Sequence, residues 1–115
     1  MPRRDTRVSL AHMRDYAREA VEMARGRLRA DLDSDRMLNL ALVRLVEIIG
    51  EAANRVPVEE RVRHPQVPWP QILGLRNRLI HAYDDVDFDT LWEVVTLDLP
   101  ALLPELERIA PPRVS

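Results

Sequence analysis

The stretch 36-RMLNLALVRLVEIIGEAANRV-56 is the most apolar segment of the chain, and it decides the fold. Its apolar residues recur at spacings of three and four, which is the period of an α-helix. They cover well over half of the circumference of that helix and leave one narrow polar line. That line holds Arg44, Glu47, Glu51 and Asn54 or Arg55. A helix with so wide an apolar surface belongs at the centre of a helical bundle, and Pro57 ends it because proline has no N–H to donate.

A second helix is predicted before the central one. Residues 10–28 place apolar side chains along one stripe at helical spacing, with Leu28 as its last member. Gly26 and the acidic residues that follow it mark a turn. Either Ser34 or Asp35 then caps the central helix, since short polar side chains accept the N–H groups that a helix leaves unbonded at its start.

A proline-rich link and two more helices are predicted after the central helix. One helical turn is expected near 59–63, and a long helix is expected from about 69 to 83, where an acidic run breaks it. Thr90 and Glu93 fit a capping box at the start of the last helix, in which each side chain accepts the backbone N–H of the other. Prolines interrupt this helix, so a kink or a break is expected near 97–99.

Length and composition indicate one all-α domain. The chain has 115 residues, enough for a single core, and it has no cysteine. We expect an antiparallel bundle of four to five helices over residues 1–115, with 110–115 as a frayed tail. A homodimer is also expected, because three neighbours of this length do not cover the apolar surface of the central helix. The chain shows no export signal and no stretch of ~20 apolar residues, which favours a cytoplasmic protein without a membrane partner.

Charge restricts the binding partners. All 17 basic residues are arginine, yet the net charge is −2, so the chain is no general binder of polyanions. Arginine binds phosphate through two parallel N–H groups, and a local arginine cluster is the remaining route to RNA. The candidate cluster is Arg61, Arg63, Arg76 and Arg78. No metal site is predicted, since the three histidines do not have the spacing of metal ligands.

The stretch 74-GLRNRLIHAYDDVD-87 gathers the polar groups that are most capable of chemistry. On a continuous helix, Asn77 and His81 lie one turn apart on the same face. Arg76 and His81 diverge by about 140° around such a helix. Either the long Arg76 side chain curls round, or a second subunit supplies the partner groups.

These residue types are sufficient for one reaction. Histidine transfers protons near neutral pH, and arginine stabilises negative charge on a phosphate that is under attack. In RNA the 2′-hydroxyl can serve as the nucleophile, so a histidine and an arginine suffice for cleavage without a metal. Spacing by itself leaves the alternative open that these residues form an ordinary solvent-exposed helix face.

The sequence 76-RNRLIHAY-83 resembles the signature of the HEPN superfamily, an Arg and a His separated by four to six residues, with a polar residue after the Arg. Its form here, Arg, four residues, His, one residue, Tyr, is similar to the HepT toxin branch. Other stretches resemble the same family at the end of its second helix, the approach to the motif and the final helix. They are 49–55, 68–69 with 72–76, and 87–92 with 98–100. The resemblance covers about residues 8–109.

This resemblance implies the toxin of a type VII toxin–antitoxin pair: an all-helical homodimer that acts as a metal-independent endoribonuclease, with its cleft between the motif helices of two subunits. Arg76 and His81 are then the catalytic pair, and Asn77 and Arg78 are accessory residues. The resemblance implies no cofactor. The implied antitoxin is an MntA-like nucleotidyltransferase that transfers AMP from ATP to Tyr83 and so blocks the RNA site. A larger hetero-oligomer with the antitoxin is left open.

Acidic residues outside the motif have more than one interpretation. Glu47 and Glu51 lie one turn apart, and a polar seam with salt bridges to Arg44 or Arg55 is the favoured interpretation. The alternative is a contact to Arg76 or to the cleft, with Glu51 preferred over Glu47 as the accessory residue. The acidic run 84–89 is interpreted as a solvated turn with a helix cap, although it also offers a surface to a basic antitoxin.

Two alternatives to a ribonuclease toxin remain. The first is a non-catalytic helical partner that binds a nucleotidyltransferase and is modified by it. The second is a plain helical dimer without activity, in which the polar residues of the motif are freely replaceable.

Overall fold

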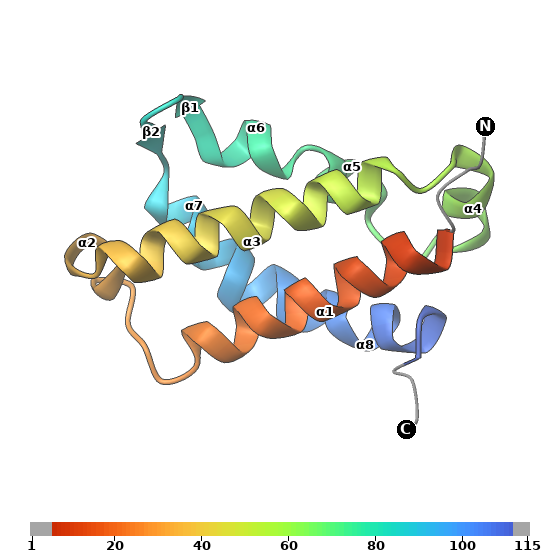
Figure 1. The fold of residues 1–115 in the computed structure, drawn as a ribbon, viewed down its shortest axis with the longest axis horizontal. Helices are drawn as coiled ribbons and strands as arrows, with labels where there is room; N and C mark the ends of the chain where they lie inside the picture. Colours follow the sequence, from red (N-terminus) through yellow and green to blue (C-terminus); the bar gives the residue numbers. More distant parts are fainter. Residues whose placement is uncertain (1–5, 112–115) are drawn as a thin grey trace.

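The computed structural model describes residues 6–111, which form helices and one short hairpin (Figure 1). The helices are α1 (Thr6–Ala24), α2 (Asp31–Ser34), α3 (Arg36–Asn54), α4 (Val58–Arg63), α5 (Trp69–Leu73), α6 (Leu75–Leu79), α7 (Phe88–Glu93) and α8 (Leu99–Ile109), with a π-helical segment η1 (Val94–Asp98) between the last two. The strands β1 (Ile80–Ala82) and β2 (Asp85–Val86) pair in antiparallel fashion.

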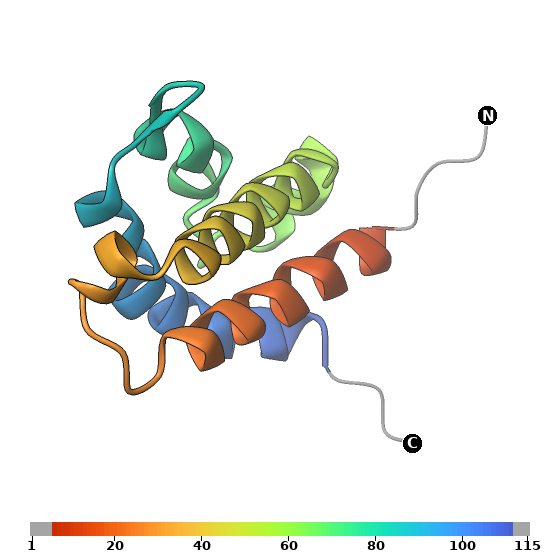
Figure 2. The ribbon, with the colours of Figure 1, turned by 60° about the vertical axis from the view of Figure 1, so that its left-hand side comes forward.

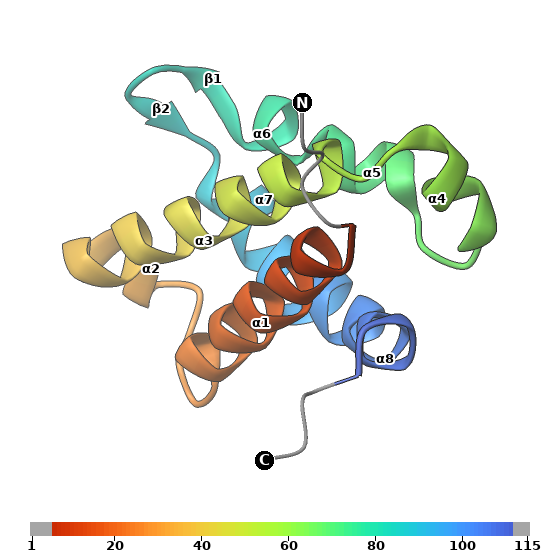
Figure 3. The same ribbon diagram turned by 45° about the vertical axis from the view of Figure 1, so that its right-hand side comes forward.

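Helix α3 lies at the centre of the molecule, as its apolar surface predicts. It runs antiparallel to α1, and α5, α6 and α7 also contact it (Figures 1 and 3). Its side chains Leu42, Val46, Ile49 and Ala53 are completely buried. Burial of a leucine or isoleucine side chain contributes roughly 1.5–3 kcal/mol, so this face of α3 supplies much of the core.

The connection from α1 to α3 has a glycine near its start and a helix cap at its end. Helix α1 ends at Ala24, and Gly26 follows with a φ of +75°, a conformation that glycine adopts without strain. The expected stripe therefore stops early, and Leu28 is exposed. Asp35 caps α3 as predicted, because its Oδ1 accepts the Leu38 N–H at 3.1 Å. A 2.7 Å hydrogen bond from Arg27 and, next in size, the capping bond lower the pKa of the Asp35 carboxyl.

The predicted break in the last helix is confirmed. Proline at 100 has no N–H, so the carbonyl of Thr96 has no donor at the usual helical position, and the chain widens into η1 at this point. In the same segment, the Thr96 hydroxyl donates to the Trp92 carbonyl at 2.6 Å. At the end of α8, the buried Arg14 donates to the carbonyls of Ala110 and Pro111. The rest of the expected tail, 112–115, lies outside the described residues.

The expected helix from 69 to 83 is wrong in two places. The backbone of Gly74 leaves the helical region and separates α5 from α6, and the chain becomes extended at Ile80. Ile80 pairs with Val86, and the Asp87 N–H donates to the Leu79 carbonyl at 2.8 Å, so residues 80–86 close into a hairpin. The bundle is therefore mostly helical rather than strictly all-α. Figure 2 shows the hairpin standing out from the helices.

In the part of the chain that the structure describes, no helix is both long and apolar enough to cross a bilayer.

The central position of α3 predicts the effect of a cavity in it. Leu42→Ala removes a completely buried side chain and is expected to lower the free energy of unfolding by about 2–5 kcal/mol. The measurement is urea unfolding followed by circular dichroism. Leu28→Ala is the matched control, because Leu28 is 70% exposed and the same truncation there changes stability by at most about 0.5 kcal/mol. Equal losses in both variants would contradict the central role of α3.

Candidate active site

The motif residues come from two different elements at one edge of the molecule. Arg76, Asn77 and Arg78 belong to the short helix α6, whereas His81 lies on β1 and Tyr83 in the turn of the hairpin. Because the helix ends at Leu79, the expected stacking of Asn77 and His81 one turn apart does not occur. The relative position of Asn77 and His81 therefore depends on the hairpin and not on helical geometry.

Arg76 faces a carboxylate from α3. Its Nε lies 3.5 Å from Oε2 of Glu47, and the Arg76 side chain is 72% exposed. Glu51, the candidate accessory residue, lies 3.3 Å from Arg44 on the surface of α3, as the polar seam predicts. The polar line of α3 predicted a carboxylate near the motif, but Glu47 occupies this place, one turn earlier than Glu51.

His81 faces a carboxylate that the sequence analysis did not assign to the site. Its Nε2 lies 3.8 Å from Oδ2 of Asp87, and 59% of the His81 side chain is exposed. Asp87 is also the N-cap of α7: its Oδ1 accepts the Thr90 N–H at 3.0 Å, and its Oδ2 accepts the Thr90 hydroxyl at 2.7 Å. The expected capping box that begins at Thr90 is therefore wrong, since α7 begins one turn earlier.

The two bonds from Thr90 hold the pKa of the Asp87 carboxyl below its ordinary value. The backbone N–H of Thr90 makes the largest contribution, its hydroxyl comes next, and the nearby His81 contributes less. Asp87 thus favours its charged form in the folded protein, and it presents a negative charge to the His81 imidazole.

Arg78 points to a different part of the surface from Arg76. Its Nη1 lies 3.5 Å from Oδ2 of Asp98, and it lines a groove of about 460 Å³ between α5–α6 and η1–α8. The groove floor is apolar and includes Ile72 and Leu102.

The four arginines of the expected RNA-binding cluster have four different partners. Arg61 donates to the Val56 carbonyl at 2.9 Å, Arg63 pairs with Glu60 at 3.2 Å, Arg76 pairs with Glu47 and Arg78 pairs with Asp98. Arg61 completes the end of α3, so its first role is structural. Arg76 keeps most of its side chain open to solvent.

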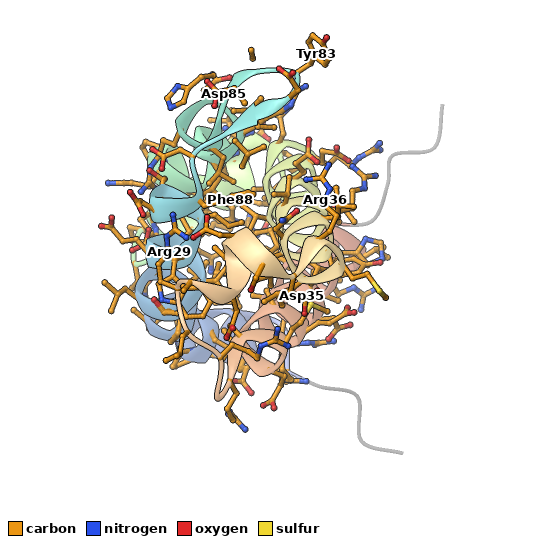
Figure 4. All side chains as sticks on the ribbon, turned by 90° about the vertical axis from the view of Figure 1, so that its left-hand side faces the viewer. Arg29, Asp35, Arg36, Tyr83, Asp85 and Phe88 are labelled. Carbon is orange, nitrogen blue, oxygen red and sulfur yellow. The ribbon has the colours of Figure 1, made fainter. Side chains whose placement is uncertain are left out.

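Tyr83 stands at the tip of the hairpin and points away from the body of the protein (Figure 4). It is 97% exposed, so an enzyme can reach its hydroxyl without unfolding any part of the domain. Within residues 6–111, no group of three or more His, Asp or Glu side chains is arranged to hold a metal ion.

Comparisons with known proteins agree on one family. Residues 13–109 match the family described as "Ribonuclease HepT-like". "Putative RNase TTE0752" of Caldanaerobacter subterraneus is 36% identical over 100 residues, which cover 87% of this chain and 89% of that protein. "Putative RNase MJ1380" of Methanocaldococcus jannaschii is 34% identical over 107 residues, covering 93% and 98%. "Probable ribonuclease HepT" of Thermococcus cleftensis is 38% identical over 79 residues, covering 69% and 72%. No solved structure matches the chain significantly.

The pKa of Asp87 predicts how its contribution to stability depends on pH. The pKa is depressed in the folded state, so the unfolded chain binds a proton more readily. Asp87 therefore stabilises the fold above its ordinary pKa of 3.8, and this contribution is lost as the pH falls through the lower folded value. We expect Asp87→Ala to lower the melting temperature at pH 7, and the difference from wild type to narrow below about pH 4.

Thermal unfolding at several pH values measures this difference. Asp85→Ala is the control, because Asp85 is an exposed carboxylate on β2 of the same hairpin. If Asp87→Ala lowered the melting temperature by the same amount at every pH, the charge of the capping carboxylate would not contribute to stability.

Proposed function

Because the chain belongs to the HepT-like ribonuclease family, we propose that it is a metal-independent endoribonuclease and the toxin of a toxin–antitoxin pair. One observation carries the proposal: Arg76 and His81, the two residues of the family signature, lie on consecutive elements at one edge, largely open to solvent. Each has its own carboxylate neighbour. The names of the relatives support a ribonuclease.

The proposed reaction uses the RNA itself as the nucleophile. The 2′-hydroxyl attacks the adjacent phosphorus, the 5′-oxygen of the next nucleotide leaves, and a 2′,3′-cyclic phosphate forms. His81 takes the proton from the 2′-hydroxyl or donates one to the leaving oxygen. Its Nε2 faces Asp87, so Nδ1 is the nitrogen left for this exchange.

Arg76 binds the phosphate that is under attack and stabilises its growing negative charge. Its pair with Glu47 does not prevent this. An exposed ion pair is worth only about 0–1 kcal/mol, so a phosphate that offers two oxygens to the guanidinium displaces the carboxylate easily. Glu47 keeps the arginine near the edge until RNA arrives.

The homodimer is part of the proposal. Met37 and Leu40 of α3 are 82% and 52% exposed, so the chain leaves part of its most apolar helix uncovered. A second copy is proposed to cover this face and to place its own motif beside the first. The cleft between the two motifs then binds RNA, and groups from both subunits contact one phosphate.

Tyr83 is the proposed control residue. AMP transferred to its hydroxyl by a nucleotidyltransferase antitoxin adds a negative and bulky group to the tip of the hairpin that carries His81. Its phosphate repels the phosphates of RNA, and its nucleoside occupies the approach to the site. The almost complete exposure of Tyr83 supports this role.

The first test is RNA cleavage by the purified protein in EDTA. His81→Ala and Arg76→Ala are each expected to lower the cleavage rate by about 10²–10⁴, because each removes a group that acts on the reacting phosphate. The measurement is the cleavage of total tRNA and messenger RNA resolved on gels.

His64→Ala is the matched control, since His64 lies in the loop after α4 and belongs to no part of the proposed site. All variants must elute at the mass of the wild type, which is two chains if the homodimer forms. Equal cleavage by wild type and His81→Ala would point to a contaminating nuclease, and the proposed site would be wrong.

A second test concerns Tyr83. Incubation with ATP and a nucleotidyltransferase of the proposed antitoxin class is expected to add AMP to the wild type and to abolish cleavage. Tyr83→Phe removes the acceptor hydroxyl, so this variant is expected to keep its mass and its activity under the same conditions. Mass spectrometry and the cleavage assay report the two effects. If Tyr83→Phe still gained the mass of AMP, the residue that accepts AMP would not be Tyr83.

The non-catalytic partner remains the second candidate, and the exposure of Tyr83 equally favours it. It predicts AMP transfer to Tyr83 without any RNA cleavage by the unmodified protein. The plain helical dimer predicts neither.

A further inference from the structure

Asp87 connects three parts of the site. Its N–H donates to the Leu79 carbonyl at 2.8 Å and closes the base of the hairpin. Its carboxylate accepts both the N–H and the hydroxyl of Thr90 and caps α7. Its Oδ2 lies 3.8 Å from Nε2 of His81. A single residue thus joins the end of α6, the start of α7 and the imidazole.

The position of this carboxylate is fixed from a second direction. Arg29, in the connection between α1 and α2, donates to Asp89 at 2.7 Å, and its guanidinium lies 6.0 Å from the centre of the Phe88 ring (Figure 4). The first two residues of α7 are therefore anchored to another part of the fold, and Asp87 precedes them directly. Most of the His81 side chain is exposed by contrast, so the carboxylate positions the imidazole and not the reverse.

We propose that Asp87, held by Thr90, is a positioning residue that orients the His81 imidazole. This inference rests on the proposed ribonuclease function. A movement of the ring by about 1 Å turns the 3.8 Å contact into a hydrogen bond from Nε2–H to Oδ2. That bond fixes which nitrogen carries the proton and leaves Nδ1 facing the RNA.

Other charged groups near His81 have different positions or partners. Asp84 and Asp85 belong to the same hairpin and are exposed, and the carboxylate of Asp89 is paired with Arg29. Arg76, on the preceding helix, is paired with Glu47. Within residues 6–111, the carboxylate that lies within ion-pair distance of His81 is that of Asp87.

Asp87→Asn separates positioning from folding. Asparagine is as good an N-cap as aspartate, so the bond from the Thr90 N–H and the fold are expected to persist. The charge is lost together with its pH-dependent contribution to stability, so the melting temperature at pH 7 is expected to fall less than in Asp87→Ala. We expect the cleavage rate at saturating RNA to fall by on the order of tenfold, with little change in KM, because an exposed charge acts more weakly than a buried one. Asp85→Asn, which makes the same charge change on the same hairpin, is the matched control and is expected to behave as wild type.

A second readout does not depend on catalysis. Nitrogen-15 spectra of the histidine side chains report the protonation of each ring nitrogen, with His12 and His64 as internal references. The distribution of the proton between Nδ1 and Nε2 of His81 is expected to differ between Asp87→Asn and wild type, and to be unchanged in Asp85→Asn. Thr90→Val removes the hydroxyl bond to Oδ2 but keeps the N–H bond to Oδ1, so an intermediate change is expected.

The outcomes separate this inference from the proposed function. His81 signals that are the same in wild type, Asp87→Asn and Asp85→Asn would overturn the positioning role, even if Asp87→Asn had lost activity. A shift specific to Asp87→Asn and Thr90→Val supports it. If the wild type cleaves no RNA, the ribonuclease proposal fails, while the spectra still decide whether Asp87 governs His81.

Discussion

Burial of the apolar face of α3 is the constraint on which the other elements depend. Because this surface is wider than one partner covers, α1 packs along one side of α3 and α5, α6 and α7 approach from others. The helices that follow α3 are short, since prolines and Gly74 interrupt them. The chain after α3 therefore folds over the central helix in several pieces, and α6 with the hairpin that follows it places the motif at the edge.

The candidate site is attached to this core without being part of it. The part of the core that α6 supplies ends at Leu79, which is completely buried, and the next residues leave the bundle as a hairpin. Arg76 and His81 are consequently surrounded by water, where single charges are well screened. In the proposed function their charges act more strongly once an RNA strand and a second subunit exclude that water. In the free protein the carboxylates of Glu47 and Asp87 lie beside them.

The same separation fits the control by modification that is proposed for Tyr83. Tyr83 lies two residues after His81, at the tip of the hairpin. A group attached there changes the approach to His81 without disturbing any buried contact. Arg76, His81 and Tyr83 thus lie outside the buried core, whereas Asp87 both caps α7 and faces His81.

Local patterns in the sequence were sufficient to predict the elements that form through local interactions. The central helix, the cap at Asp35 and the break before Pro100 all follow from residues close in sequence. The hairpin does not. Residues 75–82 have a helical pattern, and the bond that ends the helix comes from Asp87, eight residues beyond Leu79.

The same limit applies to the candidate site: its residues could be predicted from the sequence, but their contacts could not. The family signature identifies Arg76 and His81, whereas their neighbours depend on tertiary packing. Glu47 and Glu51 lie on one polar line, so periodicity does not distinguish which of them reaches Arg76. Asp87 faces His81 only because the hairpin brings the two together, and a predicted helix through residue 83 conceals this contact.

The most direct test of the chemistry proposed for Arg76 and His81 is the identity of the ends that cleavage produces. RNA would be cut in EDTA and in water enriched with oxygen-18, and the fragments of the earliest time points would be weighed by mass spectrometry. Attack by the 2′-hydroxyl predicts 2′,3′-cyclic phosphates without oxygen from the solvent, together with free 5′-hydroxyl ends. Labelled 5′-phosphates and free 3′-hydroxyls would mean that water is the nucleophile, which contradicts the mechanism proposed for these residues.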